Sequence, residues 1–138
     1  MSIIENFKCL VIDDMASARA MIEQSLIEID NSVHVDQAES ILQARRLIES
    51  KKRLLANYDL ILCDWEMPEG PGIDLLKWFK ESKISEKTCF MMLTTVTEVE
   101  RVLQAIQIGS DGYIVKPFRP NDLLKKINEA LEKKVGKK

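Results

Sequence analysis

The sequence contains a single histidine, His34, among 138 residues. A metal centre built on histidines, a Ser-His-Asp triad and a histidine phosphocarrier are therefore hard to assemble, and we expect His34 to lie at the surface or at a strand end. The three cysteines, Cys9, Cys63 and Cys89, are widely spaced in apolar runs and form no C-x-x-C pair. We expect them to be buried free thiols.

No apolar run approaches the roughly 20 residues that a membrane span requires. The first residues, MSIIENFKC, show neither the charged region nor the apolar region of a signal peptide. These two absences predict a cytoplasmic protein with no membrane insertion.

Positive charge is not in excess, because 20 basic residues stand against 22 acidic ones and give a net charge of -2. A nucleic-acid-binding domain normally carries a basic stripe or patch, so we expect no nucleic-acid partner. A basic cluster closes the sequence at residues 132–138, and we expect it to be a solvated tail.

The composition is that of one globular domain. Hydrophobic residues make up 46% of the chain and charged residues 30%, and this length allows one sizeable core but not two domains of ordinary size. Repeats, low-complexity tracts and linkers are absent from the sequence. We therefore expect residues 1–138 to form a single domain.

Short apolar runs alternate with stretches of helical periodicity, which is typical of βαβ units and a parallel sheet. The runs expected to be strands are residues 7–12, 33–35, 58–63, 88–93 and 112–115. The stretches expected to be helices are residues 15–29, 40–55, 73–81, 98–108 and 121–134. With right-handed crossovers, this order predicts an α/β fold, a doubly wound five-stranded parallel sheet flanked by five helices.

Local signals mark some of the element ends. Asp14 is placed to cap the first helix, and Gly109 is placed to end the helix at 98–108. The prolines and glycines between Pro68 and Gly72 predict a loop before the third helix.

Polar residues gather where the predicted strands end. Ligands of such sheets bind outside the carboxyl ends of the strands, so we expect the residues that follow the strands to meet at one edge. These residues are Asp13 and Asp14, Asp64, Thr94 and Thr95, and Lys116.

Three carboxylates, a hydroxyl and an ammonium group are suited to phosphoryl chemistry. Close carboxylates repel one another unless a cation neutralises them, and Mg²⁺ is the expected ion because it prefers oxygen ligands. One carboxylate can then accept a phosphoryl group, while the ammonium stabilises charge on the transferring group. Taken singly, each residue could be an ordinary helix cap or loop residue, but their joint placement favours one site.

Four segments resemble the CheY-like receiver domains of bacterial two-component signalling. They are the Asp-Asp pair after the first strand, DWEMP at 64–68, MLTT at 92–95 and GYIVKPF at 112–118. The resemblance extends from about residue 7 to residue 131, and the segments come in the family's order. It implies a flavodoxin-like, CheY-like topology.

The resemblance also implies site roles. Asp64 resembles the phosphoacceptor, which takes its phosphoryl group from a phosphohistidine on a partner or from a small acyl phosphate. Asp14 resembles the direct Mg²⁺ ligand and Asp13 the acid that holds metal-bound water, with Mn²⁺ as a substitute ion. The backbone carbonyl of Glu66 would be a further ligand. Lys116 resembles the lysine that pairs with the phosphoryl group, followed in the family by a cis proline bond.

A switch is implied as well. Thr94 resembles the hydroxyl that moves toward the phosphate, and Tyr113 the aromatic whose rotamer follows it. Together they would couple the site to the face made by residues 98–108, 112–115 and 121–134. The implied partners are a sensor histidine kinase or a histidine phosphotransferase, and an output protein that binds this face.

The expected output is protein binding, because no DNA-binding segment follows the last helix. The sequence does not choose among a flagellar motor switch, a relay phosphotransferase and a kinase as the partner. We expect a monomer, with dimerisation on activation left open. The expected activity is self-catalysed phosphoryl acceptance with slow autodephosphorylation, not that of an enzyme.

Three departures from the family pattern stand out. The loop contains Gly70-Pro71 where the family more often has an apolar residue and an acid, and residues 49–57 form a longer stretch before the third strand. Glu66 lies where, in the family, side chains affect the attack of water on the phosphate. We expect it to change the lifetime of the phosphate, but the sequence does not predict whether it lengthens or shortens that lifetime.

Three other functions are alternatives to the phosphoacceptor. A receiver-like interaction module that never uses the phosphate is the main alternative, although such modules usually lose part of the acidic site. A phosphohydrolase would need a second aspartate where Glu66 stands and a larger pocket. A flavodoxin-like cofactor binder is disfavoured because Asp13 and Asp14 would repel a phosphate.

Overall fold

The computed structural model describes residues 7–54, 56–84, 86–95 and 99–136. Leu55 and Glu98, which the sequence predicts as helix ends, lie outside the described residues, as do Lys137 and Lys138 of the predicted tail. Five parallel strands form one sheet in the order β2-β1-β3-β6-β7. They are β1 (Lys8–Ile12), β2 (His34–Ala38), β3 (Leu60–Asp64), β6 (Cys89–Thr94) and β7 (Gly112–Val115).

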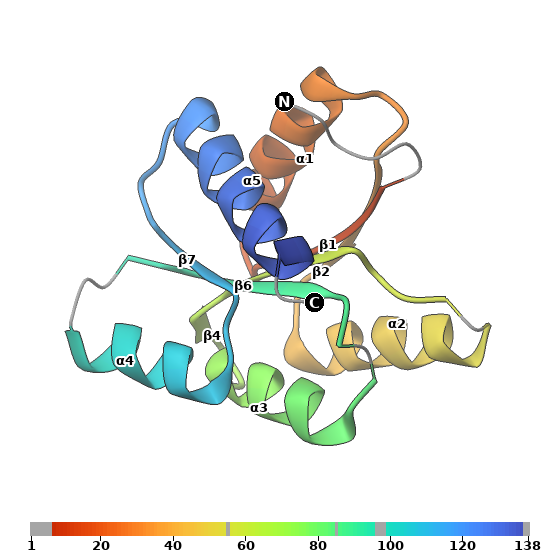
Figure 1. The fold of residues 1–138 in the computed structure, drawn as a ribbon, viewed down its shortest axis with the longest axis vertical. Helices are drawn as coiled ribbons and strands as arrows, with labels where there is room; N and C mark the ends of the chain where they lie inside the picture. The colour runs from red at the N-terminus through yellow and green to blue at the C-terminus, as the bar shows by residue number, and fades with distance from the viewer. Residues whose placement is uncertain (1–6, 55, 85, 96–98, 137–138) are drawn as a thin grey trace.

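Helices cover both faces of this sheet, which confirms the predicted doubly wound α/β fold. Figure 1 shows α1 and α5 on one side of the sheet and α2, α3 and α4 on the other. The helices are α1 (Ala16–Ile29), α2 (Ile41–Arg53), α3 (Ile73–Ser82), α4 (Val99–Ile108) and α5 (Pro120–Gly136).

The central strands are apolar along their whole length because both of their faces are covered. Every residue of β3 and of β6 is buried. One core lies beneath α2, α3 and α4, and includes Ile48, Leu76 and Phe79. The second core lies beneath α1 and α5, and includes Ile22 and Ile127. Buried apolar surface on both faces therefore fixes the orientation of each strand end.

Several details follow the sequence. The three cysteines are buried and free, as expected, and His34 is exposed at the start of β2. Gly109 ends α4 with a φ of 114°, and its N–H donates to the carbonyl of Ala105. The Lys116-Pro117 peptide bond is cis.

Other details differ from the predictions. The weak second strand at 33–35 is in fact β2, five residues long, because its pairing with β1 extends to Ala38. The loop after β3 contains a two-stranded antiparallel ladder of β4 (Glu66–Met67) and β5 (Gly70–Pro71), which the turn residues did not reveal.

The predicted solvated tail is largely helical. The last helix continues to Gly136, and within this segment Lys134 lies 3.1 Å from Asp111 in a largely buried ion pair. The apolar face of α5 holds this end of the chain against the sheet, which brings Lys134 to its partner.

The prediction that Asp14 caps α1 is wrong. The N-cap is Met15, which makes no side-chain capping hydrogen bond, and the Met15 N–H donates instead to Oδ1 of Asp13 at 3.0 Å. Asp14 is exposed, and its carboxylate lies near those of Asp13 and Asp64. Asp14 thus belongs to the acidic cluster and not to the helix cap.

The start of α3 packs closely against the end of β3. The Gly72 N–H donates to the carbonyl of Trp65 at 2.7 Å. A Cβ added to Gly72 would lie 2.0 Å from the carbonyl oxygen of Asp64 and 2.9 Å from the Sγ of Cys63. Only glycine allows this approach, which holds the backbone at Asp64 in place.

We predict that Gly72→Ala lowers the free energy of unfolding by about 1–3 kcal/mol, because rigid backbone must shift to admit the methyl group. Urea denaturation followed by circular dichroism measures this loss. Gly112→Ala is the matched control, since the added Cβ would meet chiefly the terminal methyl of Met91, which can rotate away. Equal losses in the two variants would show that the contact with Asp64 is not the cause.

Candidate functional site

Three aspartates meet at the carboxyl edge of the sheet. Asp13 and Asp14 follow β1, and Asp64 ends the neighbouring strand β3. One carboxylate oxygen from each lies within 4.8 Å of the others. Asp13 is fully buried and Asp64 is nearly so, whereas Asp14 is exposed. The cluster is thus open to solvent on the side of Asp14.

Lys116, which follows β7, is the cation of this cluster. Its Nζ donates to Oδ2 of Asp13 and lies 3.5 Å from Oδ2 of Asp64. The Lys116 N–H donates to the carbonyl of Thr94 at 2.7 Å, which fixes the backbone from which the side chain extends. One ammonium therefore bridges two of the three carboxylates.

Burial raises the pKa of the Asp64 carboxyl to about 6. The positive charge of Lys116 opposes this increase in pKa, and the negative charge of Asp13 adds to it. The backbone N–H of Glu66 donates to the Asp64 carboxylate and also favours the ionised form. Desolvation outweighs these favourable contacts, so the Asp64 carboxyl holds its proton to a higher pH than a solvated carboxyl does.

The predicted switch residues are in direct contact. Thr94 ends β6 and is fully buried, and its side chain is hydrogen-bonded to that of Tyr113 on β7. Burial raises the pKa of the Tyr113 phenol, and this hydrogen bond lowers it. Thr95, one residue further on, is exposed, so only Thr94 faces inward.

The loop beside the acceptor is held by two helices. The Glu66 carboxylate accepts from Arg101 of α4, whose guanidinium carbon lies 5.2 Å from the centroid of the Trp65 ring. The Glu69 carboxylate accepts from the N–H of Ile41, in the first turn of α2, at 3.0 Å. This loop, which follows Asp64, is thus attached to both α2 and α4.

Two basic residues of the site were missed in the sequence. Arg101 pairs with a residue 35 positions away, and no motif marks it. Arg19 of α1 donates to the backbone carbonyl of Asp13 at 2.7 Å and to Gln37 at 2.9 Å. Its position in the first turn after the Asp-Asp pair was the available signal for this contact.

The donor set fits a hard divalent cation. Its three carboxylates offer only oxygen ligands, which Mg²⁺ prefers, and their proximity leaves negative charge that Lys116 balances only in part. An acidic cluster of this kind is typical of the Mg²⁺ site of receiver domains. No described residue offers a histidine or cysteine ligand to this cluster.

Most of the residues predicted for the site meet at this edge. Asp13, Asp14, Asp64 and Lys116 are in direct proximity, and the strand that ends at Thr94 lies between the strands that lead to Asp64 and Lys116. The side chain of Glu66 points to Arg101. The role predicted for its backbone carbonyl as a metal ligand stays a prediction.

The fold and the acidic cluster at its sheet edge are those of a receiver domain. A model of the response regulator receiver domain matches residues 9–128. The chain belongs to this family, whose members are phosphoacceptors and not conventional enzymes.

Chemotaxis proteins are among its relatives. The chain is 29% identical over 129 residues to chemotaxis protein CheY-3 of Vibrio cholerae, which covers 94% of this chain and 95% of that protein. It is 32% identical over 126 residues to chemotaxis protein CheY1 of Helicobacter pylori, with 90% and 96% of the two chains covered.

Solved structures agree with the fold. A CheY-like receiver domain protein from Methanospirillum hungatei matches with a TM-score of 0.80 at 26% identity, over 96% of this chain and 98% of the other. CheY4 of Vibrio cholerae also matches with a TM-score of 0.80 at 30% identity, over 91% and 98%. Across the residues that the structure describes, no helix is both long enough and apolar enough to span a membrane.

We predict that Asp64→Asn stabilises the metal-free protein at neutral pH. The pKa of Asp64 is 3.8 in the unfolded chain and about 6 in the folded one, so the folded state binds the proton more tightly. Ionisation therefore costs no stability below pH 3.8, costs more as the pH rises, and reaches its full cost above about pH 6. The full cost is roughly 1–3 kcal/mol.

Denaturant unfolding of both proteins in EDTA, from pH 3.5 to 8, measures this difference. Glu129→Gln, an exposed site on α5 with the same change of charge, is the control and is expected to have little effect. A stability difference that does not change with pH would contradict the role of desolvation.

Proposed function

We propose that this chain is the phosphoacceptor of a two-component phosphorelay, and that Mg²⁺-dependent phosphorylation of Asp64 changes its affinity for a partner protein. The observation that carries this proposal is the convergence of the carboxylates of Asp13, Asp14 and Asp64 within 4.8 Å, with Lys116 beside them. A structural ion pair would need one acid for one lysine. A third carboxylate adds repulsion that only a further cation relieves.

The reaction is in-line phosphoryl transfer to the Asp64 carboxylate. A carboxylate oxygen of Asp64 attacks the phosphorus, and the bond from phosphorus to the donor's nitrogen or oxygen breaks, with its electron pair leaving on the donor. The product is an acyl phosphate on Asp64. Attack of water on the same phosphorus later regenerates the carboxylate and releases inorganic phosphate.

Asp13, Asp14 and Asp64, with the backbone carbonyl of Glu66, would hold the ion. Bound Mg²⁺ supplies positive charge that neutralises the carboxylates and the phosphoryl oxygens. Lys116, which lies 3.5 Å from Asp64, would pair with an oxygen of the transferred group. The Thr94 hydroxyl, at the end of the strand between those that lead to Asp64 and Lys116, would donate a hydrogen bond to another.

A route from the site to the surface supports the switch. Thr94 is hydrogen-bonded to Tyr113 of β7, so movement of its hydroxyl toward a phosphate would release the phenol. Beside Tyr113, α4 presents Val99, Leu103 and Ile106, which are 69%, 51% and 60% exposed. These three residues share one side of the helix, and with α5 and β7 they form what we call the output face.

An exposed apolar row of this kind is suited to a protein partner. We propose that the output face binds an output protein, and that the phosphoryl donor is a sensor histidine kinase or a histidine phosphotransferase. The relatives named as chemotaxis proteins support a chemotaxis-like output as one form of this function. The single domain of residues 1–138, the cytoplasmic location and the monomeric state stay predictions.

The proposal predicts a single phosphoryl adduct when the protein is incubated with acetyl phosphate and Mg²⁺. Intact mass spectrometry detects the adduct, which should need Mg²⁺ and be absent from Asp64→Asn. Beryllofluoride with Mg²⁺ provides a second readout that needs no phosphodonor. In a Trp78→Phe background the fluorescence comes from Trp65, which is buried beside the acceptor.

The absence of both the adduct and a change in Trp65 fluorescence would contradict the phosphoacceptor function. The chain would then act as a phosphorylation-independent interaction module. A fluorescence response without an adduct would restrict the donors to a cognate partner and leave the site chemistry in place.

We predict that Arg101→Ala slows phosphorylation by acetyl phosphate roughly two- to fivefold. Arg101 neutralises the exposed Glu66 carboxylate at the mouth of the site, and an unneutralised charge there would repel the anionic donor. The initial rate of adduct formation at saturating Mg²⁺ measures the effect.

Two further variants test the cause. Arg101→Lys keeps the positive charge and should phosphorylate at close to the original rate, and adding Glu66→Gln to Arg101→Ala should restore most of the loss. If the double variant stays as slow as Arg101→Ala, the position of α4 and not the charge of Glu66 is responsible.

A further inference from the structure

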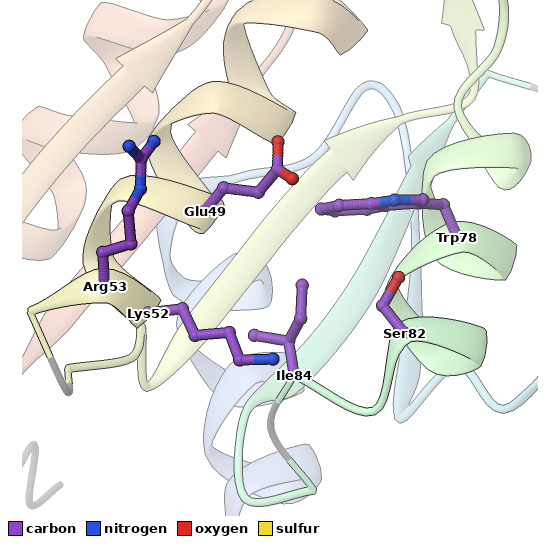
Figure 2. A pocket seen from close by; sticks show the side chains of 6 residues that line it. All are labelled: Glu49, Lys52, Arg53, Trp78, Ser82 and Ile84. Carbon is purple, nitrogen blue, oxygen red and sulfur yellow. The ribbon is translucent and has the colours of Figure 1, made fainter.

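A groove of about 520 Å³ lies between the last turns of α2 and α3, away from the acidic site. Figure 2 shows Glu49, Lys52 and Arg53 projecting from α2, with Trp78 and Ser82 on the facing wall formed by α3 and Ile84 between the two walls. Its volume is that of a site for a small molecule or for one or two side chains of a partner.

The groove is remote from Asp64. Both helices begin at the carboxyl edge of the sheet, where Ile41 contacts Glu69 and Gly72 contacts Trp65. At a rise of about 1.5 Å per residue, Lys52 and Ser82 lie roughly 15 Å further along the helix axes. A ligand in this groove would not touch the acceptor or the output face.

The helix α2 is rich in positive charge and supplies Lys52 and Arg53 to the wall of the groove, while its Lys51 pairs with Asp36 outside the groove. The helix α2 carries Arg45, Arg46, Lys51, Lys52 and Arg53 against one acid, Glu49, although the whole chain has a net charge of -2. Within the described part of the chain, Lys52 and Arg53 form no ion pair. Basic residues in the last turn of α2 also stabilise the helix through its dipole. This stabilisation alone does not account for a groove with an aromatic residue opposite them.

Two of the residues that line the groove are apolar. Trp78 and Ile84 pack with one side against the core beneath α3 and remain partly exposed on the other. Arg45 lies over the Trp78 ring, with its guanidinium carbon 4.6 Å from the ring centroid. This contact holds the ring across the groove, where it offers an edge and a face to an incoming side chain.

We propose that this groove docks an acidic segment of a partner protein, whose bulky apolar side chain enters between Trp78 and Ile84. Carboxylates flanking that side chain meet Lys52 and Arg53. Glu49 accepts a hydrogen bond from the segment's backbone N–H, and it would repel the continuous negative charge of a nucleic acid. Because the groove is remote from Asp64, docking is independent of phosphorylation, and it keeps the protein near its partner in both states.

Labelled octapeptides are the probe, each with three acidic residues on either side of a central pair chosen from Leu, Ile, Phe and Trp. Two matched sets replace the acids with Asn and Gln, or the central pair with Ala. Fluorescence anisotropy should give tighter binding for at least one acidic peptide than for both of its matched partners, by about tenfold.

The charge-reversed variant Lys52→Glu/Arg53→Glu should weaken that binding about tenfold. The control Lys125→Glu/Lys126→Glu makes the same change of charge on exposed positions of α5, on the other side of the sheet, and should leave binding unchanged. Asp64→Asn, and beryllofluoride with Mg²⁺, should also leave it unchanged, so failure of the phosphoacceptor function would not affect this result.

The docking proposal is overturned if no acidic peptide exceeds its matched partners. It is also overturned if the α5 control weakens binding as much as the α2 variant, or if a uridine oligonucleotide binds the groove more tightly than every peptide.

Discussion

The ion pair between Lys116 and Asp13 is the interaction on which the site depends. Three carboxylates at one sheet edge repel one another, and Asp13 is fully buried, so a charge there needs a partner within the protein. The ammonium of Lys116 supplies it while remaining 3.5 Å from Asp64. Burial is the main reason why the pKa of the Asp64 carboxyl rises although a lysine lies beside it, and the negative charge of Asp13 adds to the rise.

The parallel sheet is what made most of this predictable from sequence. A strand that is buried on both faces must be apolar until it leaves the sheet, so the first polar residue after each run marks the functional edge. This reasoning located Asp13, Asp64, Thr94 and Lys116, and the order of the runs predicted the doubly wound fold. The same burial explains the three free cysteines, each of which occupies an ordinary apolar position in β1, β3 or β6.

The parts that could not be predicted depend on contacts between distant surface residues. Arg101 meets Glu66 only because α4 packs beside the loop after β3, and Lys134 meets Asp111 because α5 continues as far as the residue that precedes β7. Asp14 fits the usual pattern of a helix cap in sequence, but the helix begins one residue later than this pattern predicts, and the N–H of its N-cap Met15 donates to Asp13. Each of these contacts depends on the direction in which a side chain points, and the spacing of residues in the sequence does not determine that direction.

The attachment of the loop after Asp64 to two helices has a consequence for how such a protein can evolve. Glu66 and Glu69 attach the loop to α4 and α2, and neither residue is one of the three clustered aspartates. Substitutions at Arg101 or in the first turn of α2 can therefore reshape the surroundings of the acceptor while the aspartates stay intact. The side chains that fasten the loop are separate from the clustered aspartates, so selection can alter the surroundings of Asp64 without altering the acidic cluster itself.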